Sequence, residues 1–117
     1  MAEAFANHYG SDVLTAVSSG LAPTQSVARN TVLAMEEMNI DVSGHVPRLF
    51  NRFEAADCDI VINMAGFQLP ALQPGDAIEW KVNDPYGSPL DTYRAVRNDL
   101  EQRVMRLILD LRKQAKR

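Results

Sequence analysis

Apolar residues recur every three or four positions over the last third of the chain. From Leu90 onward the recurring positions are Tyr93, Val96, Leu100, Val104, Leu107, Ile108 and Leu111. Charged residues fill much of the intervening sequence, so one face of a helix would be apolar and the opposite face solvated. The pattern predicts one long helix that ends near Lys113.

Two shorter helices are predicted near the start of the chain. Residues 1–9 combine helical apolar spacing with Gly10, a residue that commonly ends a helix. A second helix is expected to open at Pro23 and Thr24 and to run to about Met38.

The middle of the chain predicts a third helix and a shorter helical piece. Pro47 suits the first turn of a helix, and Leu49, Phe50 and Phe53 would then form its apolar face. Residues 66–70, which begin with Gly and end with Pro, are expected to form one or two helical turns.

Three segments have the composition of strands. Residues 13–18 are rich in β-branched side chains, residues 58–64 are a nearly continuous apolar run, and residues 77–82 follow a Pro-Gly-Asp turn. Helices separate these strands, and that alternation is typical of a parallel sheet covered by helices. We therefore expect an α/β fold with three layers, α/β/α, in a single domain that spans residues 1–117.

Charge and hydropathy exclude several classes of function. A formal net charge of -3 provides no basic field, so no nucleic-acid partner is expected. Apolar runs such as Ile60 to Met64 are too short to cross a bilayer, and Glu3 follows Met1 where a leader would be basic. The sequence thus predicts a cytoplasmic protein with no membrane partner.

Cys58 is the only cysteine of the chain. One thiol forms neither an internal disulfide nor a cysteine-rich metal site, so we expect no metal and no cofactor. Cys58 begins an apolar run, and the position six residues later is Met64, where a phosphate-binding loop would need an arginine. The sequence therefore predicts a buried structural role for Cys58.

Asp84 is the strongest candidate for chemistry. In open parallel sheets, ligands bind beyond the carboxyl ends of the strands, and the loop NDPYGSP places Asp84 directly after the last predicted strand. A carboxyl group there is suited to act as a proton donor over a bound ester. The alternative is an ordinary Asp-Pro turn.

Several segments occur in the order found in one known family. They are MAEAF, VSSGL, GHVPRLF, DIVINM, and WKVNDPYG followed by DTYRAVRNDLEQRV. The chain thereby resembles the low molecular weight protein tyrosine phosphatases over nearly its whole length. The resemblance implies the phosphotyrosine phosphatase I-like fold.

In that family a strand and a loop of cysteine, five residues and arginine precede the AEA helix. Those features would lie upstream of Met1, so the resemblance implies that the N-terminal central strand is absent and that the start is truncated or mis-assigned. The chain as given is expected to be inactive. The absence of that strand would expose two sheet edges, and we expect these edges to cause self-association.

The resemblance also assigns roles to individual residues. It makes Asp84 the general acid that protonates a leaving phenol, and Tyr86 part of a rim that receives an aromatic ring. Ser18 and His45 match the pair that supports the phosphate loop from behind. His45 is otherwise a solvated loop residue, and Tyr86 is otherwise a half-exposed packing residue.

Two classes of function follow from these roles. The first is a phosphatase that acts on a phosphorylated protein or a small phosphate monoester. The second is a non-catalytic relative that binds phosphorylated or intact phosphatase domains. Arsenate reductases of the same fold family relay oxidation to two further cysteines after the middle strand, and MAGFQLPAL contains none, so that relay is excluded here. An arsenate reductase-related protein without the cysteine relay is a further alternative.

Overall fold

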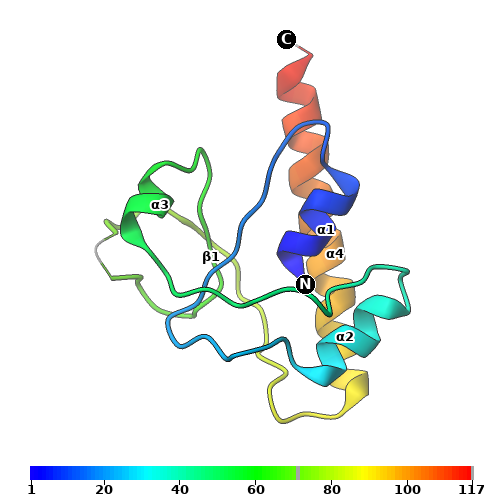
Figure 1. The fold of residues 1–117 in the computed structure, drawn as a ribbon. Helices are drawn as coiled ribbons and strands as arrows, with labels where there is room; N and C mark the ends of the chain where they lie inside the picture. Colours follow the sequence, from blue (N-terminus) through cyan, green and yellow to red (C-terminus); the bar gives the residue numbers. More distant parts are fainter. Residues whose placement is uncertain (71, 117) are drawn as a thin grey trace.

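The long C-terminal helix organises the fold (Figure 1). The computed structural model describes residues 1–70 and 72–116. The elements within this part are α1 (Ala2–Tyr9), α2 (Arg29–Glu36), α3 (Arg52–Ala56), β1 (Ile62–Asn63), β2 (Ile78–Glu79) and α4 (Leu90–Ala115). Figure 1 shows β1 between α3 and the α1–α4 pair. None of the described helices is long and apolar enough to cross a membrane.

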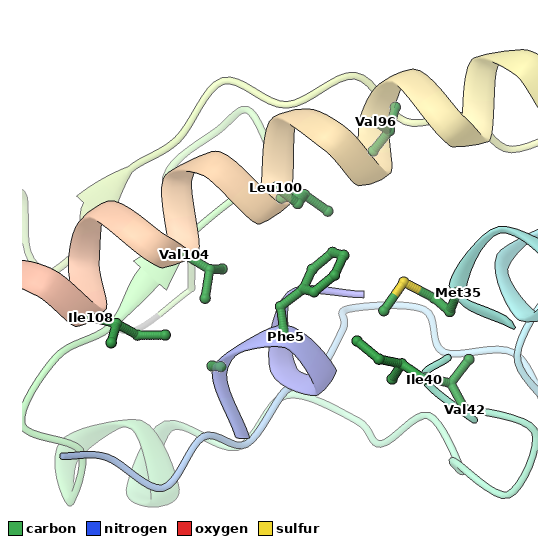
Figure 2. Close-up of a cluster of buried hydrophobic side chains, with 9 residues drawn as sticks. Phe5, Met35, Ile40, Val42, Val96, Leu100, Val104 and Ile108 are labelled. Atoms are coloured by element: carbon green, nitrogen blue, oxygen red, sulfur yellow. The ribbon is translucent and has the colours of Figure 1, made fainter. Parts of the chain in front are cut away.

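The core lies where α1 and α2 pack against α4. The side chains of Phe5, Met35 and Ile108 have no exposed surface, and Figure 2 shows them along the space that α4 shares with α1 and α2. Gly10 allows the close approach of α1, because a Cβ atom there would lie 2.8 Å from the Ile108 side chain. The periodic apolar face predicted for the C-terminal helix therefore forms the centre of the core.

Charged residues fix α2 to the beginning of α4. The buried Arg97 donates to the carbonyl oxygen of Ala34 at 2.9 Å and to the carboxylate of Glu37. Arg94 donates to the same carboxylate, and hydrogen bonds from these two arginines lower the pKa of Glu37 to about 2. The carboxylate therefore stays charged between its two cations at neutral pH.

The predicted parallel sheet is confirmed, although its strands are short. Ile62 pairs with Ile78 and Asn63 pairs with Glu79 in a parallel register. Each strand was expected to span six or more residues, over 58–64 and 77–82, but the regular pairing covers two residues in each.

The strand expected at residues 13–18 is not formed. Its backbone groups bond to side chains of α1 instead. The Asn7 side chain donates to the Ala16 carbonyl oxygen and accepts from the Ala16 backbone amide. The Ser18 backbone amide donates to the Glu3 carboxylate at 2.8 Å. A strand needs a neighbouring backbone, and the described residues supply one only at Gly20, which bridges to Leu49 in parallel. Local β propensity was therefore insufficient.

The helices in the middle of the chain are shorter than expected. The second helix was predicted from Thr24 but begins at Arg29, and the Thr24 hydroxyl bonds to the Ser26 carbonyl oxygen instead of capping it. The third helix was predicted from Pro47 but begins at Arg52, because the Asn51 side chain accepts hydrogen bonds at its first turn.

The expected apolar face of the third helix is not buried. Leu49 lies before the helix in the bridge to Gly20, and Leu49 and Phe53 are 66% and 68% exposed. The helical turns expected over residues 66–70 are not formed: Gly66 and Phe67 lie in a bend, residues 68 and 69 are irregular, and Pro70 lies in a turn. The long last helix ends at Ala115, close to the expected Lys113.

Replacement of Ile108 with alanine tests the α1–α4 core. We expect Ile108→Ala to lower the free energy of unfolding by about 2–5 kcal/mol, because it leaves a cavity in the core beside Gly10 at the end of α1. Its neighbour Leu109 is 50% exposed, so Leu109→Ala serves as a matched control with a smaller loss. Urea denaturation measures both changes, and equal losses would contradict the assigned core.

The exposed apolar residues predict self-association. Large apolar side chains that are about half exposed or more include Val17, Val46, Leu49, Phe53, Phe67 and Ile78. Burying such residues against a second copy is favourable, and short open sheet edges offer unpaired backbone groups. We expect sedimentation velocity at micromolar concentration to show oligomers that Phe53→Glu weakens. A compact monomer would contradict this prediction.

Candidate functional site

Two adjacent cavities meet at the beginning of α1. The larger has a volume of about 710 Å³ and extends from Met1 to the loop after β2. The smaller has a volume of about 340 Å³ and extends from Met1 to the loop that carries His45. Met1 and Thr31 line both cavities, so the helix start lies between them.

Asp84 lines the larger cavity. It follows β2, and the parallel register places the carboxyl ends of β1 and β2 at the same edge of the sheet. Trp80 and Met64 line the same cavity from the segments that follow these strands. The side chain of Asp84 is exposed, which leaves its carboxyl group accessible to a molecule in the cavity.

Asp84 also lies in the Asp-Pro turn that the sequence suggested as the alternative. The Asp84 carboxylate accepts a hydrogen bond from the Tyr86 amide at 3.0 Å, and the Ser88 amide donates to the Pro85 carbonyl oxygen at 2.8 Å. Gly87 has a φ of 77°, a value that favours glycine. These contacts give the loop a defined conformation, so the turn orients the acid.

Tyr86 lies outside both cavities. Its side chain is 78% exposed, and it does not line either cavity. The described structure therefore places Asp84 at the larger cavity and leaves the Tyr86 side chain outside both cavities.

Ser18 and His45 meet in the smaller cavity, and Glu3 joins them. Glu3 Oε1 accepts from the Ser18 amide at 2.8 Å, and Glu3 Oε2 lies 3.2 Å from His45 Nδ1. Glu3 belongs to the first turn of α1. The carboxylate thus connects the helix start to two loops that are distant in sequence.

Asp41 orders the loop that carries His45. Its carboxylate accepts from both the hydroxyl and the amide of Ser43, at 2.6 and 2.9 Å. The side-chain bond from Ser43, followed by the backbone bond, lowers the pKa of Asp41. The charged carboxylate therefore stabilises the turn that leads to His45.

Asn63 orders the loop after β1, from which Met64, Ala65 and Gly66 line the larger cavity. It is the least exposed polar side chain described, at 2%, and it donates to Phe67 O at 2.8 Å and to Glu79 at 3.1 Å. Its oxygen accepts from the Ala65 amide. The sequence analysis did not identify Asn63 or Glu3. Asn63 could have been noticed as a polar residue inside the apolar run DIVINM, and Glu3 as an acid in the first turn of a helix.

The predicted burial of Cys58 is wrong. Cys58 is exposed, because α3 ends at Ala56 and the strand begins only at Ile62. Its Sγ lies 3.4 Å from the Glu54 carbonyl oxygen, and Cys58 lines neither cavity. Among the described residues, no three His, Cys, Asp or Glu side chains are grouped so that they could hold a metal ion.

Comparison with known sequences identifies related proteins. A sequence model described as low molecular weight phosphotyrosine protein phosphatase matches residues 1–117. A glutaredoxin arsenate reductase of Synechocystis is 35% identical over 112 residues, which are 92% of this chain and 85% of the relative. A putative arsenate reductase of Halobacterium salinarum is 33% identical over 98 residues, 82% and 68% of the two chains.

Solved structures have the same fold. An arsenate reductase in the oxidized state superposes with a TM-score of 0.81 at 33% identity, covering 94% of this chain and 86% of the other. A low molecular weight protein tyrosine phosphatase from T. tengcongensis has a TM-score of 0.76 at 21% identity, covering 93% and 88%. The phosphatase structure shows the likeness of fold alone, whereas the arsenate reductase is also related in sequence.

Substitution of Glu3 tests the connection to Ser18. We expect Glu3→Ala to shift the NMR signals of the Ser18 amide and the His45 ring, because both lose the carboxylate that they contact. Glu36→Ala is a suitable control, since Glu36 is an exposed acid of α2 and lines neither cavity. Unchanged Ser18 and His45 signals in Glu3→Ala would refute the connection.

Proposed function

The chain belongs to the low molecular weight phosphotyrosine protein phosphatase family, and from this premise we propose that it is a domain for the hydrolysis of phosphate monoesters. One observation carries the proposal. Asp84 lines one cavity, Ser18 and His45 line the other, and the two cavities share Met1 at the start of α1. The proposed acid and the proposed supporting pair thus flank the same point.

The start of α1 suits a tetrahedral anion. The first amides of a helix have no partner within the helix, and the helix dipole favours negative charge there. Within the described part of the chain, no side chain caps this end of α1 by a hydrogen bond. An ester phosphate at this point would have Asp84 on one side to protonate the leaving oxygen, and the Ser18 and His45 loops on the other.

The nucleophile is proposed to lie in a segment that precedes α1. In the family resemblance, a cysteine, five residues and an arginine immediately precede this helix, and their cradle would face the two cavities. Cys58 is distant from this role because it lines neither cavity. The substrate is proposed to be a phosphorylated protein or a small phosphate monoester.

A second candidate function is the reduction of arsenate. The 35% identity to a protein named glutaredoxin arsenate reductase favours it, and arsenate has the same tetrahedral shape and charge as phosphate. The segment after β1 contributes no cysteine, so the chain's own residues offer no thiol relay there. Reduction would require thiols from a separate protein. A domain that only binds such anions is the remaining alternative.

Assays of the chain as given test the role of Cys58. We expect no hydrolysis of p-nitrophenyl phosphate, because a general acid contributes about 10²- to 10⁴-fold and does not act without a nucleophile. Cys58→Ser should leave this result unchanged. If the parent chain hydrolyses the substrate and Cys58→Ser abolishes that activity, Cys58 is the nucleophile. The proposal that the nucleophile lies in a segment before α1 would then be wrong.

Addition of a strand and a cysteine–arginine loop before Met1, about fifteen residues, tests the proposed function. We expect hydrolysis of aryl phosphates, and Asp84→Asn should lower its rate by about 10²- to 10⁴-fold because the leaving oxygen loses its proton donor. His45→Ala should cost less, about 10- to 100-fold, because it acts through loop placement. Steady-state kinetics measure both.

The extended chain also separates the two candidate activities. Arsenate reduction in the presence of glutathione and glutaredoxin, without phosphate hydrolysis, would favour the second candidate. If the extended chain hydrolyses aryl phosphates and Asp84→Asn leaves the rate unchanged, Asp84 is only a turn residue.

A further inference from the structure

One arginine ties the segment that leads to Asp84 to α4. Arg103 Nη2 donates to the carbonyl oxygen of Lys81 at 2.9 Å, and its guanidinium carbon lies 5.9 Å from the centroid of the Trp80 ring. Arg103 Nε donates to Asp99 at 3.0 Å, one turn earlier on the same helix. The guanidinium is therefore oriented by its own helix while it binds the segment.

This contact lies where the sheet ceases to hold the chain. The last ladder bond of β2 runs from the Trp80 amide to Asn63 O at 2.9 Å. In the described part of the structure, no backbone amide of residues 81–84 donates a hydrogen bond. Val82 packs against the core, so the Lys81 carbonyl is the polar attachment nearest to Asp84 on its N-terminal side.

We infer that Arg103 is a positioning residue for Asp84: it holds Trp80 and Lys81 against α4 and so fixes the position of the acid at the larger cavity. The inference rests on the proposed function, because it concerns the proposed general acid. Trp80, Lys81 and Asp84 all line that cavity, so a movement of Lys81 displaces the cavity wall and the acid together. A misplacement of about 1 Å is enough to cost about 10²-fold in rate.

The attachment on the other side of Asp84 is weaker. The Asn30 side chain donates to the Ser88 carbonyl oxygen at 3.4 Å, near the limit of a hydrogen bond. Control over the position of Asp84 therefore comes mainly from the Arg103 side.

Trp80 provides a direct test in the chain as given, since it is the only tryptophan. Arg103→Met keeps the aliphatic stem and removes every donor. We expect acrylamide to quench Trp80 fluorescence more strongly in this variant. We also expect the backbone order parameters of residues 81–84 to fall from near 0.85 towards about 0.6. Arg103→Lys, which retains the charge and a single donor nitrogen, should restore part of both.

Arg112 supplies a matched control on the same helix. Its Nε donates to Asp12 and its Nη2 donates to the Tyr9 carbonyl oxygen, both at 2.9 Å, so it binds a different segment by the same kind of contacts. Arg112→Met should leave Trp80 quenching and the order parameters of residues 81–84 unchanged. The inference is overturned if a folded Arg103→Met matches the parent in both measurements, or if Arg112→Met changes them equally.

Kinetics of the extended chain separate this inference from the proposed function. Arg103→Met should slow phenyl phosphate hydrolysis more than p-nitrophenyl phosphate hydrolysis, because the poorer leaving group depends more on the acid. In an Asp84→Asn background the difference should vanish. Equal losses for both substrates would overturn the positioning role. If Asp84→Asn alone has no effect, the proposed function fails, while the fluorescence and order parameters still decide whether Arg103 fixes the segment.

Discussion

The fold depends on one apolar stripe of α4. α1 and α2 bury their apolar faces against it, and Phe5, Met35 and Ile108 are fully enclosed in the core that results. The same helix positions the candidate site, because it holds the start of α1 through packing and the Asp84 segment through Arg103. Both the packing of the helices and the geometry of the candidate site therefore depend on α4.

The sequence predicted the helices of the core because their signal is local. A 3,4 spacing is a property of neighbouring residues, and both α1 and α4 end close to the expected positions. Strands depend on a partner, so the β-branched segment 13–18 was predicted as a strand but bonds to the side chains of Asn7 and Glu3. Cys58 was misplaced for the same reason, since the strand expected to bury it begins only at Ile62.

The candidate site residues that could be proposed from the sequence are those that lie in short recognisable segments. Asp84 was recognised from its loop, and Ser18 and His45 from a family resemblance, and the structure places these residues around the beginning of α1. The residues that organise them were not predicted. Glu3 and Arg103 act through contacts between segments that are remote in the chain, and no local pattern encodes such pairs.

The packing of α1 against α4 affects how the chain folds as it is synthesised. The helix α1 is made before α4, whereas many of the side chains in its core cluster belong to α4. Until that helix has been synthesised, the apolar face of α1 remains in water, where it is open to chaperones or to other nascent chains. Because its pairing is so distant in sequence, closing the core carries a large loop-closure entropy and should be slow for a chain of this size.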